Sequence, residues 1–583
     1  MNRKQRRAAS KQSPPPGLGL RLAPADPVKQ LFAEAAQYQQ KNELAEAARL
    51  YKRLLLLKPD HAEACNNLGC ILLAQGKLHE ASARLAQALA LLPQLFEQFS
   101  RVLPTLTTVL PAIGEAMHKT MAAWPTRLTA EQLLGPSGLA AIATDPMLLC
   151  ILQSVPVPDV ALERLLTSLR SSLLDAADAG TPLGQAELAF VCALAKQCFI
   201  NEYVFATTPE EEAKVERLVA GLRMALATND AIPSPWLPAL AMYQPLYLLA
   251  YANVLLDRTW PAVLEAVLTQ QLREPQQERE LRASIPRLTP IDDDVSQRVR
   301  QQYEENPYPR WIHPNGGIEP TTIDRYLREM SPTAAFTPLA KDGPLDILVA
   351  GCGTGLHSTG IAQRLPDAQV LAVDLSLTSL CYAKRKTPQP LARNITYMQG
   401  DILKLGAIGR SFDVIDAGGV LHHMADPLEA WRILLGLLRP GGFMHLGLYS
   451  ELARRNIVAA RAFIAERGYA PTPSDIRRCR QELLETPLRG LERSHDFFST
   501  SECRDLLFHV QESRMTIPGI KSFLAEHGLK FIGFEFDRPV WQDYRDLFAQ
   551  AGWSMSDLDR WHAVETKYPD TFAGMYQFWL QKN

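Results

Sequence analysis

Short apolar runs alternate with helical patterns from Asp346 onward, and one glycine-rich turn constrains how this part of the chain can fold. The first run, Ile347 to Ala350, is followed by Gly351-Cys352-Gly353-Thr354-Gly355, which opens the next helical pattern. Such alternation is typical of an α/β domain with a parallel sheet. Glycines at the turn let the backbone approach a ligand, and the helix N-terminus offers unpaired N–H groups to a negative group.

Polar residues follow three further expected strands. Val370 to Val373 ends in Asp374, about Ile395 to Gln399 leads into Gly400-Asp401-Ile402, and Phe412 to Asp416 leads into Gly418-Gly419-Val420-Leu421-His422-His423. A fifth strand is expected after Leu438-Arg439-Pro440-Gly441-Gly442. A glycine turn with an acid after the second strand also occurs in dinucleotide-binding proteins, where the acid accepts hydrogen bonds from ribose hydroxyls. Those two features alone therefore do not discriminate between cofactors.

The complete ordered set, spanning about residues 345 to 450, resembles the class I S-adenosylmethionine-dependent methyltransferases. The resemblance implies a Rossmann-like seven-stranded domain over residues 345–583, with Leu529 to Phe536 and Phe572 to Leu580 as a final antiparallel pair. It implies that the glycines border the methionine part of the cofactor, that Asp374 holds the ribose, and that Asp401 and Ile402 meet the adenine. The implied cofactor-binding set is Gly351, Cys352, Gly353, Thr354, Gly355, Asp374, Leu375, Asp401, Ile402 and Gly419. The alternative is that the glycines only shape a tight strand-to-helix turn.

One position departs from the family pattern. Many members carry an acid at the end of the first strand, where this chain has Val349. A contact to the methionine amino group is then missing, or is supplied by His357 or Tyr303.

Methyl transfer from a sulfonium is an in-line displacement, so the protein mainly supplies alignment, desolvation and a base if the acceptor is protonated. The candidate bases are His422 and His423, because they follow the fourth strand and an imidazole accepts a proton near neutrality. The alternative for either histidine is a packed loop residue. Nine scattered cysteines form no CxxC pair, so neither a zinc site nor a disulfide framework is expected, and no metal is predicted.

Two segments around the glycine turn are candidates for substrate contacts. Tyr303, Asn306 and Tyr308 lie in a segment that is interpreted as a lid over the methionine end, or else as a helix stop and rigid linker. An insertion over about 451–525 is longer than ordinary connections and is expected to shape the acceptor site. Its arginines would grip an anionic acceptor or lie on solvated helix faces.

The N-terminal half reads as helical. Residues 1–25 are basic and proline-rich, which predicts a disordered tail. Small and large apolar residues recur at a 34-residue offset over 26–95, the period of tetratricopeptide repeats. Leu- and Ala-rich patterns predict a helical domain over 96–290, and residues 291–344 form a connector.

The whole arrangement resembles a bacterial group that joins tetratricopeptide repeats to a methyltransferase domain, including residues 302–311 and 499–507. The chain has 61 Lys and Arg against 63 Asp and Glu, so no global field favours nucleic acid, and no signal peptide or membrane span is expected. A cytoplasmic methyltransferase is the leading hypothesis, with an unidentified protein or small-molecule acceptor and repeats that recruit a substrate or partner. The alternative is an interaction scaffold whose methyltransferase-like domain is catalytically silent.

Overall fold

The computed structural model describes residues 26–92, 99–314, 318–339, 341, 343–536 and 538–583, so the predicted tail over 1–25 lies outside the described residues. The chain divides into two compact units, one ending at Leu91 and one beginning at Leu92. No single helix in the described part of the chain has the length and apolar composition needed to cross a membrane. The bent pair Ala130–Ala141 and Pro146–Ser154 meets those two criteria only when taken together.

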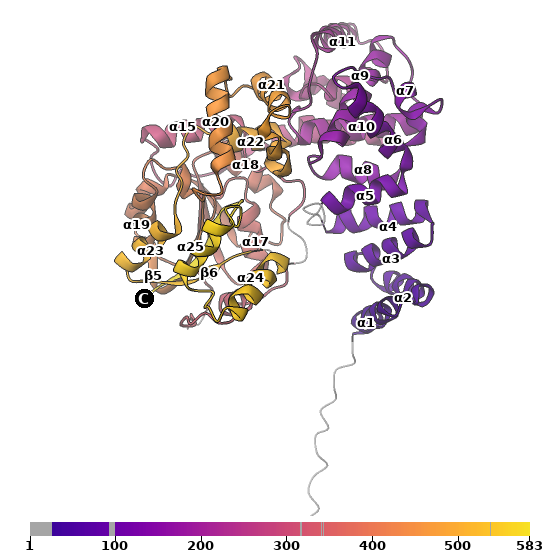
Figure 1. Cartoon of the computed structure of the whole chain (residues 1–583). Helices are drawn as coiled ribbons and strands as arrows, with labels where there is room; N and C mark the ends of the chain where they lie inside the picture. The colour runs from indigo at the N-terminus through magenta and orange to yellow at the C-terminus, as the bar shows by residue number, and fades with distance from the viewer. Residues whose placement is uncertain (1–25, 93–98, 315–317, 340, 342, 537) are drawn as a thin grey trace, which may run out of the picture. The chain divides into compact units, whose positions relative to one another are not determined.

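The first unit consists of two helical hairpins, labelled in Figure 1. Its helices are α1 (Pro27–Gln40), α2 (Leu44–Leu57), α3 (Ala62–Ala74) and α4 (Leu78–Leu91). Helices α3 and α4 cross closely at Gly69, where an added Cβ would lie 2.7 Å from Leu85 Cγ. Gly69 of the 34-residue pattern therefore lies where the helices of the second hairpin leave no room for a larger side chain.

The second unit begins with a helical region. Its helices are α5 (Phe99–Val109), α6 (Pro111–Ala123), α7 (Ala130–Leu134), α8 (Pro146–Ser154), α9 (Val160–Asp178), α10 (Gln185–Ile200), α11 (Pro209–Ala227), α12 (Trp236–Ala241), α13 (Ala262–Leu268) and α14 (Glu274–Leu281). Two further helices, α15 (Asp294–Glu305) and α16 (Ile323–Met330), lead to the sheet. Asp293 caps α15 by accepting a hydrogen bond from Val295 N.

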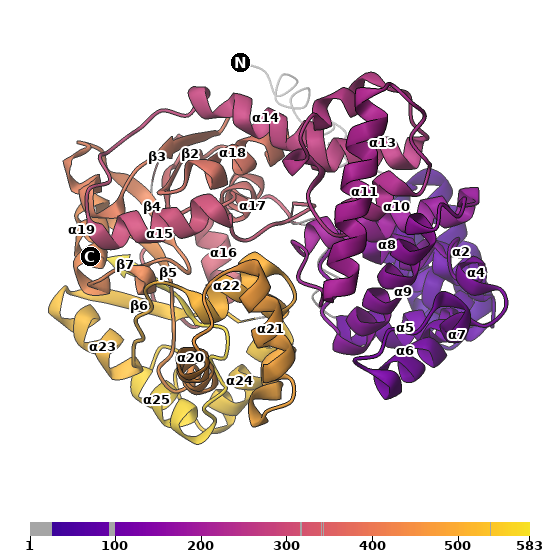
Figure 2. The same ribbon diagram turned by 90° about the horizontal axis from the view of Figure 1, so that it is seen from above.

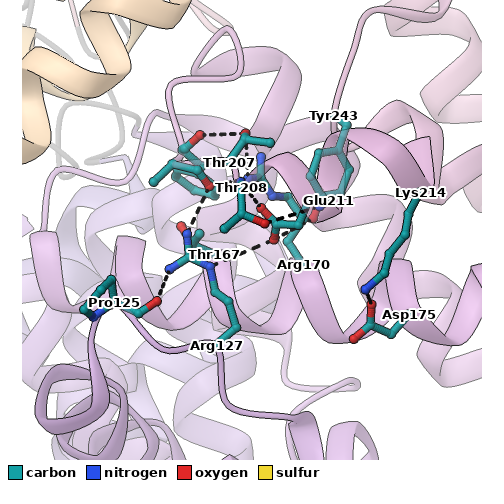
Figure 3. Close-up of polar contacts among 12 residues, drawn as sticks. Pro125, Arg127, Thr167, Arg170, Asp175, Thr207, Thr208, Glu211, Lys214 and Tyr243 are labelled. Carbon is teal, nitrogen blue, oxygen red and sulfur yellow. Dashed lines mark hydrogen bonds and ion pairs between the residues drawn. The ribbon is translucent and has the colours of Figure 1, made fainter. Parts of the chain in front are cut away.

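A buried arginine holds the helical region together (Figure 3). Arg170 on α9 donates to the carbonyl oxygen of Ala206 at 2.7 Å, and its guanidinium lies 4.1 Å from the ring centroid of Tyr243. Tyr243 in turn donates to Glu211 on α11 at 3.2 Å. A buried charge costs stability unless polar partners surround it, and these contacts supply them.

The sheet has seven strands in the order β3-β2-β1-β4-β5-β7-β6. The strands are β1 (Asp346–Ala350), β2 (Gln369–Asp374), β3 (Ile395–Gln399), β4 (Phe412–Ala417), β5 (Leu438–Leu448), β6 (Leu529–Phe534) and β7 (Tyr576–Lys582). The first five are parallel, and β7 runs antiparallel to both β5 and β6. The fifth strand begins at Leu438, earlier than predicted, because the Pro-Gly-Gly stretch is taken up as an irregularity in the β4–β5 register rather than as a turn before the strand.

Helices cover both faces of the sheet (Figures 1 and 2). Side chains alternate along β1, so Leu348 packs into one core and Ile347 into the other. The first core is completed by α19 (Pro427–Leu437), α23 (Ile517–Glu526), α24 (Arg538–Gln550) and α25 (Leu558–Lys567). The second is completed by α16, α17 (Leu356–Arg364) and α18 (Leu377–Lys386). This double covering explains why the parallel strands read as continuous apolar runs.

The predicted insertion between β5 and β6 forms a helical lobe. It contains α20 (Arg455–Arg467), α21 (Pro473–Leu483), α22 (Thr500–Phe508) and α23, and the first three share a small core of their own. Arg480 on α21 forms a two-pronged ion pair with Glu163 on α9, at 3.2 and 2.8 Å, and both side chains are buried. The lobe is thereby joined to the helical region of the same unit.

Candidate active site

A cavity of about 230 Å³ opens at the carboxyl ends of β1, β2 and β4. In an open parallel sheet this edge is where ligands bind, because the strand order reverses there. The predicted residues that line it are Tyr303, Tyr308, Gly351, Cys352, Gly353, Asp374, Leu375, Ile402, Gly419 and His423. The structure therefore brings most of the predicted site residues to one hollow.

The glycine turn needs its glycines for two reasons. Gly351 and Gly353 have φ angles of +74° and +50°, a region that side chains disfavour. A Cβ on Gly353 would also lie 2.7 Å from the carbonyl oxygen of Tyr308, and one on Gly351 would lie 2.5 Å from Val420. The turn presents backbone to the cavity where a side chain would fill it, which fits the cradle expected for a nucleoside cofactor.

Asp374 lies at the end of β2 and lines the cavity. Its two carboxylate oxygens accept hydrogen bonds from Gly353 N and Ser376 N, each at 2.8 Å. Burial raises the pKa of this carboxyl to about 6, although the two backbone donors oppose the shift. Each carboxylate oxygen can accept a second hydrogen bond, so the group retains capacity for two hydroxyl donors.

Asp401 is buried behind the cavity lining, whereas its neighbours Gly400 and Ile402 border the hollow directly. One of its oxygens, Oδ1, accepts from Leu403 N at 2.9 Å. The other, Oδ2, has no donor at standard hydrogen-bond geometry among the described residues, but the Ser296 hydroxyl is close enough to lower the pKa of this carboxyl, against the burial that raises it. A buried carboxylate oxygen without a donor is rare, and it suits a site that awaits an exocyclic amine.

Four other predicted residues lie outside the lining. Thr354 is buried and donates to the carbonyl oxygen of Pro309, and Gly355 is packed against Ala383. Asn306 accepts from Arg504 at 2.5 Å, facing away from the cavity. His422 stacks on Tyr449 at 3.7 Å, with both ring nitrogens buried. These four residues contact other parts of the protein and do not line the cavity, so the geometry does not favour direct contact with a cofactor or an acceptor.

The segment from Tyr303 to Pro309 lies against the glycine turn. Tyr303 O accepts from Ser376 Oγ at 3.0 Å, and Tyr303 OH donates to Asp505 Oδ1 at 2.7 Å. Tyr308 OH donates to Asp496 at 3.4 Å. The segment thus joins the sheet edge to the inserted lobe and forms one wall of the cavity.

His423 is held in one tautomer. Its Nδ1 lies 2.9 Å from the carbonyl oxygen of Gln511, so Nδ1 carries the proton and Nε2 keeps its lone pair. Burial lowers the pKa of His423 to about 4, which keeps the ring neutral at pH 7. Its ring stacks on His509 with centroids 3.6 Å apart. A neutral imidazole with an available lone pair can accept a proton.

His423, Asp505 and His509 place one potential metal-ligand atom each within 4.8 Å of the others. His509 Nδ1, however, accepts the backbone N–H of Gln511 at 3.0 Å, so its Nε2 carries the proton and faces Tyr303 OH at 3.2 Å. A protonated nitrogen cannot bind a metal. The hydrogen bonds instead join Tyr303 OH to Asp505 and His509, and burial raises the pKa of Asp505 to about 6.

The arginines of the inserted lobe divide into two kinds. Arg454 is buried, pairs with Glu512 at 2.5 Å and lies over the ring of Tyr449, and Arg480 pairs with Glu163. Arg455 and Arg478 have largely exposed side chains. The sequence offered two interpretations of these arginines, an anion grip or solvated helix faces. Neither accounts for the buried Arg454 and Arg480, which join parts of the fold through their ion pairs.

Comparison with known proteins identifies the domain that holds the cavity. Residues 348–446 match the family model described as "Methyltransferase domain". The chain carries a methyltransferase domain. Its cofactor is S-adenosylmethionine, in agreement with the cavity described above.

The relatives align with this chain over different lengths. An uncharacterised protein of Synechococcus is 28% identical over 305 residues, covering 48% of this chain and 70% of that protein. Malonyl-[acyl-carrier protein] O-methyltransferase of Halalkalibacterium halodurans is 34% identical over 108 residues, covering 18% of this chain and 39% of that enzyme. The structure of PKMT2 from Rickettsia typhi in complex with AdoHcy aligns with a TM-score of 0.34 at 18% identity, covering 44% of this chain and 52% of that one. The chain thus spans well under half of the curated methyltransferase with a named substrate.

Sequence reasoning missed several side chains at the cavity of the methyltransferase domain. Asp416, Tyr449 and Asp505 all line it. Asp416 lies within an apolar strand, and Asp505 lies in the inserted lobe at a position that only the fold brings to the sheet edge. An acid near the carboxyl end of a mostly apolar strand, Asp416, was a signal available in the sequence.

Proposed function

We propose that this protein transfers the methyl group of S-adenosylmethionine to an acceptor that enters the cavity beside His423 and Asp505. The observation that supports this most directly is that the glycine turn, Asp374 and His423 border a single hollow. A cofactor cradle and a proton-accepting group then face the same reacting atoms.

The roles proposed for the cofactor-binding residues follow from their positions. The backbone N–H groups of the glycine turn would bind the methionine carboxylate, and Asp374 would accept the ribose hydroxyls. Ile402 would pack on the adenine, with Asp401 Oδ2 accepting its amine. Bound S-adenosylmethionine supplies a methyl group already activated by the sulfonium.

The residues around the acceptor align it, exclude water and hold its proton. His423 Nε2 would take a proton from the attacking group, since Gln511 fixes the proton on Nδ1. Tyr303 and Asp505 would orient the acceptor from the opposite wall, because their hydrogen bond fixes both side chains. His422, whose ring stacks on Tyr449, is proposed to be a packed loop residue rather than a base.

Tyr303 and Tyr308 are further proposed to close the methionine end of the cavity as a lid. Support comes from the Tyr308 carbonyl oxygen, which lies against the site where a Gly353 side chain would stand. Asn306 would stiffen this segment through Arg504 rather than touch a ligand. Unchanged cofactor affinity and turnover in both Tyr303→Phe and Tyr308→Phe would contradict the lid.

Residues 26–95 are proposed to be tetratricopeptide repeats that recruit a protein substrate or partner. The two hairpins have buried small residues at the 34-residue spacing, including Ala47 and Ala81. Stacked helical hairpins of this kind present extended surfaces to other proteins.

Calorimetric titration with S-adenosylhomocysteine tests the cofactor site, and incubation with labelled S-adenosylmethionine and fractionated cell extract tests transfer. We expect binding, and label in a protein or small-molecule fraction. His423→Gln should abolish labelling with little change in affinity, while His527→Gln, at the residue that follows α23 and does not line the cavity, should leave both unchanged. Binding without any labelled product would favour the silent scaffold. The absence of binding would refute the assignment of the cofactor site.

A further inference from the structure

The methionine end of the cofactor carries an ammonium group, and a charge taken out of water needs a partner. The chain lacks the acid that the end of β1 usually supplies. Val349 stands there, with its side chain in the second core, and the residue borders the cavity. A partner for the ammonium must therefore come from another element.

The sheet register places such a partner beside Val349. Across the parallel pair β1–β4, Val349 is aligned with Asp416. Side chains at aligned positions of neighbouring strands point to the same face, and the strands lie about 4.8 Å apart. Both residues line the same cavity. Asp416 thus presents a carboxylate one strand away from the missing acid.

The surroundings of Asp416 hold its carboxylate in place and keep it ionised. Its Oδ2 accepts from His445 Nδ1 at 3.0 Å, and its Oδ1 accepts from Gly418 N at 3.1 Å, with His357 Nδ1 at 3.6 Å. Burial alone would raise the pKa of Asp416, but the two histidines outweigh it and lower the pKa below its usual range. Each oxygen can accept two hydrogen bonds, so both oxygens keep acceptor capacity.

Gly418 keeps this carboxylate accessible. A Cβ at this position would lie 3.2 Å from His445 and 3.3 Å from His357, so it would push on both rings, which would have to move by a few tenths of an ångström. The absence of a side chain between the imidazoles leaves the carboxylate facing the cavity.

Two other carboxylates line the cavity, and their positions differ. Asp374 ends β2, on the far side of β1, and both of its oxygens are bound to backbone amides. Asp505 belongs to the inserted lobe and accepts from Tyr303. Two strand spacings, roughly 10 Å, separate the ends of β2 and β4, which suits ribose hydroxyls at one end and an ammonium at the other.

We propose that Asp416 binds the α-ammonium group of the S-adenosyl cofactor, in the role that Val349 cannot fill. This inference rests on the proposed cofactor site and adds the residue that recognises the amino group. His445 and His357 are positioning residues, since they act by holding the Asp416 carboxylate.

The test is a binding cycle between two ligands and two proteins. The ligands are S-adenosylhomocysteine and 5′-S-(3-carboxypropyl)-5′-thioadenosine, which lacks only the amino group. Hydrogen bonds to charged groups are worth about 1.5–3 kcal/mol, so wild-type protein should bind the deaminated ligand roughly 10- to 100-fold more weakly. Asp416→Asn should weaken S-adenosylhomocysteine by a similar factor and change the affinity for the deaminated ligand less than about twofold, since that ligand lacks the charged contact.

Asp413→Asn is the matched control, because Asp413 is a buried acid on the same strand that pairs with Lys341 and Arg439 away from the cavity. It should leave both affinities unchanged. Adding Val349→Asp to Asp416→Asn should restore part of the discrimination.

Equal weakening of both ligands by Asp416→Asn would overturn the proposal, since it would describe a scaffold role. The proposal would also be overturned if Asp505→Asn, and not Asp416→Asn, weakened only the ligand that carries the amino group. The same holds if wild-type protein bound the two ligands equally well, which can be measured without any variant. If wild-type protein bound neither these ligands nor 5′-methylthioadenosine, the cofactor site itself would be refuted, and this assignment with it.

Discussion

Replacing Glu163 by Gln should loosen the inserted lobe from the helical region. Glu163 and Arg480 form a buried ion pair with two parallel hydrogen bonds, and Arg480 also donates to the carbonyl oxygens of Phe497 and Val204. The Arg480 side chain is 0% exposed and the Glu163 side chain 4%. Glu163→Gln keeps the volume and removes the charge, which leaves the guanidinium buried without a counterion.

The size of the effect follows from the burial of Arg480. Removing one partner of a buried pair costs about 3–5 kcal/mol, because the remaining charge stays desolvated. Since 1.4 kcal/mol is a factor of ten, opening of α21 should become roughly 100- to 4,000-fold more frequent. The two carbonyl acceptors of Arg480 remain, which favours the lower part of that range.

Hydrogen exchange measured by mass spectrometry on peptides covering α21 and α22 is the suitable assay. A chain of several compact parts need not unfold in two states, whereas exchange reports opening of each part separately. Arg478→Met is the matched control, because Arg478 lies on the same helix and pairs with Asp475 while its side chain is 71% exposed. That variant should change protection by less than about 1 kcal/mol.

The double variant Glu163→Leu with Arg480→Met separates charge from shape. Replacing both charges by apolar groups of similar size should restore most of the lost protection. A cost below about 1 kcal/mol for Glu163→Gln, or a double variant as unstable as the single one, would refute the reasoning that an uncompensated buried charge is responsible.

Three further outcomes are expected. Gly353→Ala should weaken S-adenosylhomocysteine about tenfold or more by calorimetry, because its Cβ would strike the Tyr308 carbonyl at a positive φ; unchanged affinity would contradict the tight turn. Burial raises the pKa of Asp374 to about 6, so the carboxylate needed by hydroxyl donors is lost as the pH falls through 6. Affinity should therefore decline below pH 6 in titrations across pH, and Asp374→Asn should remove the part of that decline due to this group. Gly69→Val should destabilise the first unit by about 1–3 kcal/mol, measured by hydrogen exchange on peptides covering α3 and α4, since Leu85 leaves no space; unaltered protection would argue against close helix crossing.

The strand pattern and the glycine turn could be predicted from the sequence because both are local. Strand β3 has the predicted bounds. Strands β1 and β4 are each one residue longer than predicted at one end, and β2 is one residue longer at both ends. Each is a short apolar run that a turn residue closes. The predicted start of β5 was wrong because Leu438 already pairs with Phe412 of β4, ahead of Pro440 and the two glycines, where the register shifts.

The opposite wall of the cavity could not be predicted, because it depends on contacts distant in sequence. Asp505 reaches the cavity from α22 only through the packing of the inserted lobe. Asp416 reaches it through the register of β1 with β4, which no local pattern records. The different positions of His422 and His423 are likewise set by Tyr449 and His509, which lie far along the chain.

The link between Arg480 and Glu163 bears on how this protein can be divided for laboratory work. A fragment beginning near β1 would keep the carboxyl ends of the strands at the cofactor edge of the sheet. It would lack Glu163, however, so the buried Arg480 guanidinium would have no carboxylate partner. Such a fragment would also lack Tyr303 and Tyr308, which form one wall of the cavity, and its inserted lobe should become disordered and prone to aggregate. Truncations intended for substrate screening should therefore retain α9.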